Sequence, residues 1–316
     1  MRLTALSAIL TAALAATASL PAWAGVPKVV VSIKPIHSLV ASVMHGVGEP
    51  TLLVRGGASP HSYTMKPSDA KALSAADLVV WVGPELEGFL EKPLQANAPN
   101  ATRLTLMDLK SLTLLQAREG GAWEPHDHGH EQHGHEQHGH ADEHEELNSH
   151  IWLDPANARA IVTATAEALA AKDPADAEVY RTNADRTLQA LDALDAELKA
   201  TLTPLKDKPF VVFHDAYQYF EARYDLSAVG SITVSPDRRP SAKRLSAIRT
   251  KIAGLNAACV FSEPQFEPTL VRTVVEGTKA KTGVLDPEGA DLPEGESLYP
   301  TLMRNLAASL RGCLGA

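Results

Sequence analysis

The feature that most restricts the fold is an alternation, along almost the whole chain, of short β-branched runs with segments of helical period. Before residue 124 it runs KVVVSI, PIHSLVASVMHG, TLLV, PSDAKALSAA, DLVVWVG, PELEGFLEK and RLTLMDL. It resumes as PFVVFHD, AYQYFEARY, SAVGSI, RPSAKRLSAIRTKIAG, ACVFSEP, PTLVRTVVEGTKA and TGVLDP, with a final helix expected near Leu298 to Leu310. Buried strands that alternate with helices are typical of parallel βαβ units. We therefore predict an α/β fold of two lobes, each a parallel sheet flanked by helices.

The longest stretch of helical period lies between the two alternating regions. Its apolar positions are Tyr180, Ala184, Leu188, Leu191, Leu194, Leu198 and Leu202, and prolines at 174 and 204 bound it. A helix of roughly 28 residues would be about 42 Å long, which suits a strut along both lobes. The stripe is interpreted as a core face, because the charge pattern of a coiled coil is absent. The expected divisions are an N-terminal lobe at 25–172, the connecting helix at 173–205 and a C-terminal lobe at 206–316.

The N-terminal segment 1–24 has the pattern of a secretory signal. A positive charge at Arg2 precedes an apolar run, which ends in Ala22-Trp23-Ala24, so cleavage is expected after Ala24. The alternative is a retained anchor or a lipoprotein, but the run is short, no stop-transfer flank follows, and no Cys directly follows to accept a lipid. No later segment is long and apolar enough to cross a bilayer, so we expect a soluble, exported protein.

The two cysteines of the chain are Cys259 and Cys313. An even number in an exported protein favours a disulfide, because the compartment is oxidising. The alternative is a pair of thiolates on a metal ion. It is less favoured, because the two residues are far apart in sequence and no CxxC spacing exists.

The run HDHGHEQHGHEQHGHADEHEE, residues 126–146, concentrates histidine and acid. Between Glu124 and Glu146 there are eight carboxylates and no Lys or Arg, so this stretch carries nearly all of the formal net charge of −9. The rest of the chain is close to neutral, and nothing resembles a basic surface for nucleic acid or an anionic membrane. Eight of the 13 histidines belong to the run, namely His126, His128, His130, His133, His135, His138, His140 and His144.

We interpret this acidic loop, 124–149, as an accessory metal-binding segment of the N-terminal lobe. Dense imidazoles and carboxylates in a low-complexity segment offer many changing ligand sets. Each set has an ordering cost, so its affinity should lie below that of a preformed site. The segment would raise the local Zn²⁺ concentration or sense excess metal. A purification tag would be terminal and consecutive, and a solvated acidic loop without a role is the remaining alternative.

Three of the other five histidines stand where the chain leaves a strand or starts a helix. His61 is in the loop GGASPHSYTMKPSD. His150 opens HIWLDP, where Asp154 is expected to cap a helix, and His214 ends PFVVFHD, where Asp215 is expected to cap the next one. Open α/β sheets bind ligands at the carboxyl ends of their strands. We therefore expect the three imidazoles to converge on one metal ion, for which Zn²⁺ is suited, although each alone could be a hydrogen-bonded core residue.

Other candidate ligands are less clear. Asp286 in TGVLDP also ends a strand and is the candidate fourth ligand, but it is equally placed to cap a helix before Pro287. His37 and His45 lie eight residues apart on one predicted helix, without the acidic base that a metalloprotease helix has between its histidines. We interpret these two as structural or surface residues.

Catalysis has little support in the sequence. The chain has no G-x-S-x-G elbow, no phosphate loop and no glycine fingerprint for a nicotinamide cofactor. A zinc hydrolase is the main alternative from another class, since three histidines with an open position also hold catalytic zinc. It would need a nearby acidic base, and no motif places one. We therefore do not expect an enzyme.

Several segments taken together resemble one known family. In chain order they are GGASPHSYTMKPSDAKALSAADLVVWVGPELEGFLEK, HIWLDP, VVFHDAYQYFEARY, SEPQF and GVLDP. They are similar to the metal-binding solute-binding proteins of bacterial ABC transporters, and most of all to the zinc-uptake members. The likeness covers nearly the whole chain after the expected signal. It implies a periplasmic receptor of two α/β lobes joined by one long rigid helix, which holds Zn²⁺ in the cleft and delivers it to an inner-membrane permease and its ATPase.

The resemblance also implies roles for single residues. The family's metal histidines fall on His61, His150 and His214. Its carboxylate position falls on Asp286, which is a ligand in manganese-type members, whereas zinc-type members often have water or a nearby Glu instead. Some zinc members have a Glu directly before the first histidine, but this chain has Pro60 there, so that ligand is unavailable to it.

Three further expectations follow from the resemblance. Manganese members carry Glu where His214 stands, so an all-imidazole set favours zinc. The Cys259–Cys313 bridge is favoured and would tie the last helix to the second lobe. The expected partners are the permease, its ATPase and a periplasmic zinc chaperone, with the receptor itself a monomer and no nucleic acid involved. The alternatives are a Mn²⁺ or Fe²⁺ receptor of the same family, and an adhesin or metal-buffering protein without a transporter.

Overall fold

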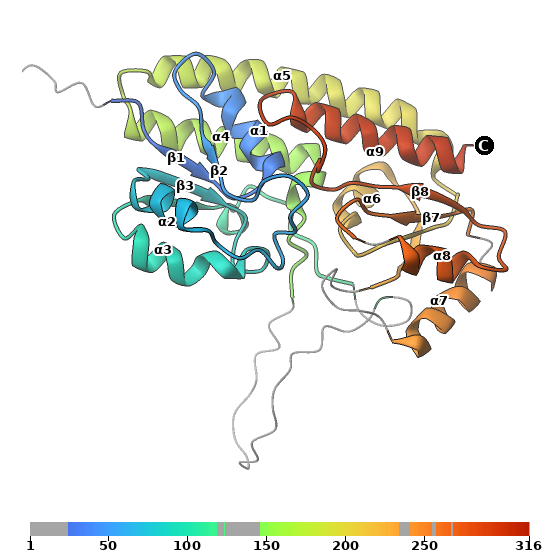
Figure 1. Cartoon of the computed structure of the whole chain (residues 1–316). Coiled ribbons are helices and arrows are strands. Elements are labelled where there is room, and N and C mark those ends of the chain that lie inside the picture. The colour runs from blue at the N-terminus through green and yellow to red at the C-terminus, as the bar shows by residue number, and fades with distance from the viewer. Residues whose placement is uncertain are drawn as a thin grey trace, which may run out of the picture.

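The computed structural model describes residues 25–118, 123, 146–233, 241–254, 257–266 and 268–315. The expected signal at 1–24 and the eight histidines of the acidic loop lie outside these residues. Within them the chain forms two four-stranded parallel sheets, side by side, with one long helix that runs along both (Figure 1). The prediction of an α/β fold with two parallel sheets flanked by helices is confirmed.

The first sheet has the strand order β2-β1-β3-β4. Its strands, all parallel, are β1 (Val29–Val31), β2 (Thr51–Leu52), β3 (Leu78–Trp81) and β4 (Thr102–Thr105). Alternate residues of β1 and β3 enter two different core clusters, so both faces of these strands are covered. Helix α1 (Lys34–Val43) packs on one face, and α2 (Pro67–Ser74) and α3 (Glu91–Asn97) pack on the other. Continuous aliphatic runs such as VVV are therefore what these strands require.

The second sheet repeats this plan with the strand order β6-β5-β7-β8. Its parallel strands are β5 (Phe210–Val212), β6 (Ala228–Ser231), β7 (Cys259–Ser262) and β8 (Lys281–Val284). Helices α7 (Ala242–Gly254) and α8 (Thr269–Val275) cover one face, while α6 (Gln218–Tyr224) packs on the other. The carboxyl ends of β5, β7 and β8 each lead into a segment that carries polar side chains, and these segments meet at the site described below.

The three longest helices described are α4 (Pro155–Lys172), α5 (Ala177–Leu202) and α9 (Leu298–Leu314). Helix α4 lies beside the first sheet and α9 beside the second, while α5 extends along both (Figure 1). Helix α5 has 26 residues and is therefore about 39 Å long. It packs against α1 and α4 beside the first sheet and against α6 and α9 beside the second. Most of its predicted apolar stripe is buried in the main core cluster, so the interpretation as a core face is confirmed. The lobe limits at 172 and 206 stay a prediction.

Covalent and polar contacts hold the segment around α9 in place. Cys259 in β7 is joined to Cys313 in α9 by a disulfide with Cα atoms 6.2 Å apart, which confirms the expected bridge. At the other end, the buried Lys34 Nζ donates to the carbonyl oxygens of Gly289 at 2.5 Å and Ala290 at 2.9 Å. The segment that follows β8 is thus fastened to the first half of the chain.

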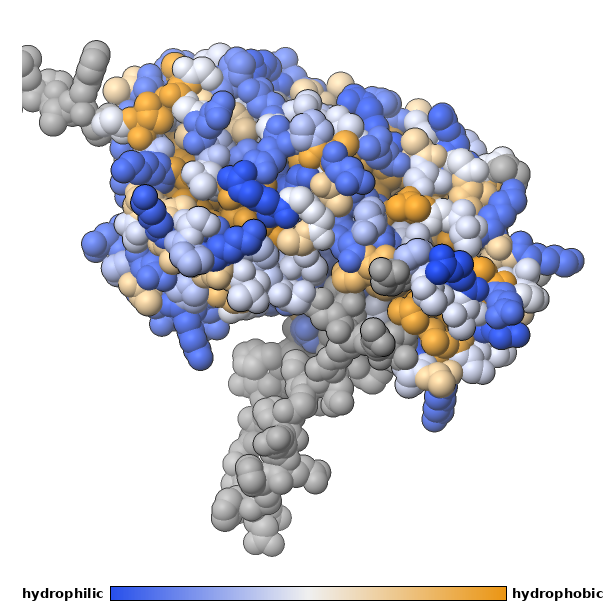
Figure 2. All heavy atoms as spheres, viewed as in Figure 1, coloured by the Kyte–Doolittle hydropathy of each residue, from blue (hydrophilic) through white to orange (hydrophobic). Residues whose placement is uncertain are grey.

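The surface seen in Figure 2 is largely hydrophilic, with small hydrophobic areas between the charged side chains. Among the described residues the large hydrophobic side chains that are exposed are Val26, Val179 and Val284, which come from different parts of the chain. No helix in the described ranges is both long and apolar enough to cross a membrane.

Candidate metal centre

The structure brings His61, His150 and His214 together, although they lie in three separate segments. His61 is in the loop between β2 and α2, His150 directly precedes a 3-10 turn at Ile151–Leu153, and His214 follows β5. The Nε2 atoms of His61 and His150 are 3.3 Å apart, and those of His214 and His150 are 3.1 Å apart. One ligand atom from each of the three imidazoles lies within 4.8 Å of the others.

His150 is oriented by Asn148. Its Nδ1 donates to Asn148 Oδ1 at 2.8 Å, and its backbone N–H donates to the same oxygen at 3.0 Å. The orientation of this amide is settled by its other end, because Nδ2 donates to the carbonyl oxygen of Asp215 at 2.8 Å. An amide oxygen can only accept, so the His150 proton sits on Nδ1 and the lone pair on Nε2.

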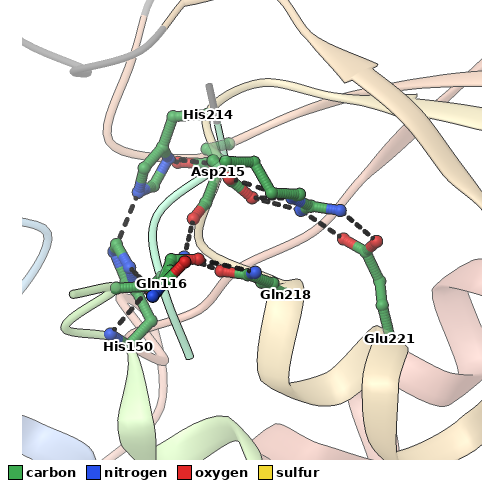
Figure 3. Close-up of polar contacts among 9 residues, drawn as sticks. Gln116, His150, His214, Asp215, Gln218 and Glu221 are labelled. Carbon is green, nitrogen blue, oxygen red and sulfur yellow. Dashed lines mark hydrogen bonds and ion pairs between the residues drawn. The ribbon is translucent and has the colours of Figure 1, made fainter. Parts of the chain in front are cut away.

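His214 is oriented by Glu263, which follows β7. Its Nδ1 lies 2.8 Å from both carboxylate oxygens of Glu263, which is 2% exposed. Tyr217 donates its hydroxyl to the same carboxylate at 3.2 Å. This places the His214 proton on Nδ1, so its Nε2 lone pair points toward His150 (Figure 3).

Two unprotonated Nε2 atoms that face each other at 3.1 Å cannot hydrogen-bond. Their lone pairs repel unless a cation lies between them. In a tetrahedral site with Zn–N bonds of about 2.0–2.1 Å, neighbouring ligand nitrogens are about 3.3–3.4 Å apart. The Nε2 separations of 3.1 and 3.3 Å are close to that edge length. The arrangement is therefore suited to bind a small divalent cation that accepts imidazole nitrogen.

Burial keeps two of the imidazoles neutral. Desolvation, with a smaller electrostatic contribution from the neighbouring His214, lowers the pKa of His61 to about 3. Burial also lowers the pKa of His150 well below its ordinary value, and His214 and His61 add to this effect. A metal ligand must be unprotonated, so these rings need not release a proton near neutral pH before they bind.

Asp286, the candidate fourth ligand, is engaged elsewhere. Its Oδ1 accepts from the backbone N–H of Glu288 at 3.1 Å and of Gly289 at 2.9 Å, and from Gln265 Nε2 at 3.0 Å. Its Oδ2 accepts from the backbone N–H of Ala290 at 2.6 Å. The carboxylate thus caps a turn after β8, rather than a helix, and it is outside the three-histidine group. Its role as a ligand stays a prediction.

Two cavities adjoin the three imidazoles. A small one, of about 10 Å³, is also lined by Glu263, Gln265 and Glu288. Burial, and then the nearby Asp286, raises the pKa of Glu288 well above its ordinary value. A wider one, of about 150 Å³, is also lined by Ala117, Glu146 and other residues on either side of segment 119–145. The site therefore has a narrow side and a wider side.

The two helix caps predicted beside the histidines have different outcomes. Asp154 accepts from the backbone N–H of Ala156 at 2.8 Å and caps α4, as predicted. The prediction for Asp215 is wrong, because α6 begins only at Gln218 and has no side-chain cap. Asp215 instead forms an ion pair with Arg118, whose guanidinium also reaches Glu221 at 2.7 Å (Figure 3). A half-buried guanidinium nearby competes more strongly for a carboxylate than backbone amides do.

Sequence reasoning missed the two residues that orient the imidazoles. Glu263 ends a strand, as His214 does, and the rule that singled out His214 could have found it. Asn148 stands two residues before His150 in an irregular stretch, and no sequence pattern marks it. The two histidines set aside as structural or surface residues behave so: His37 is buried with Nε2 2.9 Å from the carbonyl of Pro50, and His45 is exposed beside an acidic residue.

Comparisons with known proteins were consistent with one another. A family model named ZnuA, described as zinc-uptake complex component A, periplasmic, matches residues 29–313. The high-affinity zinc uptake system protein ZnuA of Brucella abortus (strain 2308) is 52% identical over 304 residues, covering 90% of this chain and 91% of that protein. A crystal structure of ZnuA has a TM-score of 0.74 at 25% identity and covers 91% of this chain and 99% of that one. A 138-173 deletion mutant of ZnuA with zinc bound has a TM-score of 0.73 at 25% identity, with coverages of 92% and 98%.

Proposed function

The chain belongs to the ZnuA family, the periplasmic component of zinc-uptake complexes, and from this premise we propose that it captures one Zn²⁺ ion on His61, His150 and His214. It then delivers the ion to the membrane part of an ABC transporter. The family is one of solute-binding receptors and not of enzymes. The bound zinc is therefore the cargo of the protein and is released unchanged.

One observation carries the proposal, namely the convergence of Nε2 lone pairs. Asn148 and Glu263 each hold a proton on the outer nitrogen of an imidazole, so the inner nitrogens present lone pairs to each other at 3.1 Å. Without a cation between them, the two lone pairs repel each other and destabilise the folded protein. A protein that bound no cation would therefore gain nothing from this arrangement. A bound Zn²⁺ replaces the repulsion by coordination.

The donor set also supports zinc as the metal. Three neutral imidazoles suit a borderline-soft ion, whereas Mn²⁺ prefers carboxylate and carbonyl oxygen. A Mn²⁺ or Fe²⁺ receptor of the same family would be favoured if Asp286 ligated, but its four hydrogen bonds to Gln265 and the turn would then have to rearrange. Competition of Zn²⁺ with Mn²⁺, in wild type and in Asp286→Ala, tests this point, and we expect the preference for zinc to survive the substitution.

Removing the histidines one at a time tests the site. We expect one tight Zn²⁺ per chain in wild type, measured by competition with a chromophoric chelator. Each of His61→Ala, His150→Ala and His214→Ala should weaken binding by more than the roughly 10–100-fold that loss of an outer-sphere contact produces. His45→Ala removes an exposed imidazole outside the group and serves as the matched control. Tight binding that persists in all three variants would refute the proposed site.

We also propose that the acidic loop is an accessory zinc-capture or sensing element. The flanks of its histidine run 126–144 are close together, since Gln116 and Leu147 form an antiparallel bridge and Ala117 donates its N–H to the carbonyl of Glu146 at 2.7 Å. Those flanks line the wider cavity beside the three histidines. Deleting 126–144 should leave the tight event intact and reduce the weaker zinc stoichiometry, which should fade between about pH 7 and 5.5 as imidazoles protonate. Loss of the tight event would contradict this division of roles.

The remaining parts of the proposal concern the cellular setting. We propose an exported monomer, processed after Ala24, that acts in the periplasm with an inner-membrane permease, its ATPase and a zinc chaperone. The lobes at 25–172 and 206–316, with the connecting helix at 173–205, are proposed as its units. Restoration of growth in a zinc-starved deletion strain separates a transport receptor from an adhesin or metal buffer. Assays of ester and amide hydrolysis by the zinc-loaded protein test the hydrolase alternative, and we expect no turnover.

A further inference from the structure

Arg118 lies beside the metal centre and holds two carboxylates at once. Its Nε donates to both carboxylate oxygens of Asp215, at 3.1 and 3.0 Å. Its Nη1 and Nη2 donate to the carboxylate of Glu221 in α6, at 2.7 and 3.0 Å. The ring of Trp123 covers one face of the guanidinium, with the ring centroid 3.6 Å from Cζ. Two paired carboxylates and a stacked ring leave this planar group little freedom to rotate.

The position of Asp215 in the chain connects this ion pair to the metal centre. Asp215 directly follows His214, in the irregular stretch between β5, which ends at Val212, and α6, which begins at Gln218. The repeating hydrogen bonds of a helix or a strand do not set the direction of the backbone there. Side-chain contacts therefore have a larger share in fixing that stretch than they have inside a regular element.

The backbone carbonyl of Asp215 is the acceptor that orients the Asn148 amide. Asn148 Nδ2 donates to it at 2.8 Å, which turns Oδ1 toward His150, whose Nδ1 lies 2.8 Å away. Figure 3 shows both imidazoles and Asp215 in one network, with Glu221 at its far end. A shift of the Asp215 backbone therefore reaches two rings, His214 through the chain itself and His150 through the amide.

We propose that Arg118 is a positioning residue of the zinc site, which acts through Asp215 on two of the three imidazoles. The inference rests on the proposed function and adds a residue from another segment of the chain to the support of that site. By pairing with Asp215, the guanidinium fixes the carbonyl on which the Asn148 amide depends. It thereby keeps the Nε2 lone pairs of His150 and His214 directed at the ion. Ligands held in this way need not be ordered at the moment the metal binds.

The charge of Arg118 makes the role testable by the sign of the effect. A nearby cation repels a bound divalent cation, so loss of the positive charge by itself should tighten zinc binding. Loss of positioning should weaken it. We expect Arg118→Met, which keeps an unbranched side chain and removes the guanidinium, to raise the Kd for Zn²⁺ about tenfold, at the low end of the losses caused by removing an outer-sphere partner.

Glu221→Gln is the matched control. It removes the other carboxylate that Arg118 holds, while Asp215 keeps its contacts with the guanidinium. It should lower the free energy of unfolding and leave the zinc Kd within roughly twofold of wild type. Long-range ¹H–¹⁵N spectra of the metal-free protein show which ring nitrogen carries the proton. The Nδ1–H form of His150 should persist in this control and be partly lost in Arg118→Met, a change that a purely structural role would not produce.

Two outcomes overturn the positioning role. One is a Kd for Arg118→Met that is within roughly twofold of wild type or below it, and the other is an equal rise of the Kd in Glu221→Gln. His61→Ala separates this inference from the proposed function and should abolish tight binding. If it does so while Arg118→Met binds as wild type, the positioning role fails and the zinc site stands. If His61→Ala binds tightly, the proposed function fails.

A double variant covers the case in which Arg118→Met does not fold, as shown by circular dichroism of the metal-free protein. The single substitution leaves the buried carboxylate of Glu221 without its cation, whereas Arg118→Met combined with Glu221→Gln leaves no such buried charge there. Asp215 loses its guanidinium in both. The same tenfold rise in the Kd is therefore expected from the double variant, and the same roughly twofold limit decides against the positioning role.

Discussion

Replacement of Asn148 offers the sharpest test of how the site is organised. In Asn148→Ala, the Nδ1–H of His150, a residue that is only 6% exposed, loses the acceptor that lies 2.8 Å away. The imidazole is then free to carry its proton on Nε2, the nitrogen that must bind zinc. Loss of such an outer-sphere partner costs about 10–100-fold in metal affinity, or about 1.4–2.7 kcal/mol of binding free energy.

A second substitution separates orientation of the ring from packing. Asn148→Asp keeps an accepting oxygen for His150 but loses the amide donor that serves the carbonyl of Asp215 and Gln218 Oε1. We expect this variant to keep most of the zinc affinity, while both variants lower the free energy of unfolding of the metal-free protein by about 1–3 kcal/mol. Zinc Kd values come from chelator competition and unfolding free energies from urea denaturation.

The matched control is Asn183→Ala, which removes another buried amide. Asn183 Nδ2 donates to the carbonyl oxygens of Val43 at 3.0 Å and His45 at 2.8 Å, away from the metal centre. It should reduce stability by a similar amount and leave the zinc Kd unchanged. A Kd for Asn148→Ala within roughly twofold of wild type, or an Asn148→Asp variant as weak as the alanine variant, would refute the argument from the tautomer.

Three further predictions concern stability. Because burial lowers the pKa of His61 to about 3, against about 6.5 in an unfolded chain, the unfolded state binds more protons as the pH falls. The contribution of neutral His61 to the free energy of unfolding is complete above about pH 6.5 and is lost progressively toward pH 3. In His61→Ala, the free energy of unfolding of the metal-free protein, measured in urea, should therefore depend less on pH. Replacing Cys259 and Cys313 by serine opens a 54-residue loop and should lower the unfolding free energy by about 4 kcal/mol in the chain-entropy picture, with zinc affinity retained. Arg118→Ala leaves the carboxylate of Glu221, which is 5% exposed, without its cation and should cost about 3–5 kcal/mol in the same assay, whereas a loss under 1 kcal/mol would contradict the pairing.

The helices, the strands and the cluster of histidines could be predicted from the sequence. Their signals lie in short stretches of the chain or in a small number of candidate residues. The period of apolar residues records whether a segment is a strand or a helix and which face is buried, and this was sufficient for all eight strands of the two sheets. With only two cysteines, a single intrachain pairing was available. The rule that parallel strands present ligands at their carboxyl ends placed His61 and His214 at one site, because it depends on topology and not on side-chain detail.

The sequence by itself determined the α/β class, the long helix, the disulfide and the residue types that could bind zinc. Only the tertiary structure decided which way each nitrogen faces and which carboxylate is occupied. Glu263 meets His214 across 49 residues, and Arg118 meets Asp215 across 97. Such partners depend on how the packed sheets and helices bring side chains within about 3 Å, the range over which hydrogen bonds act. Periodicity along the chain contains no record of those distances, so Asp215 was expected at a helix cap and is found in an ion pair.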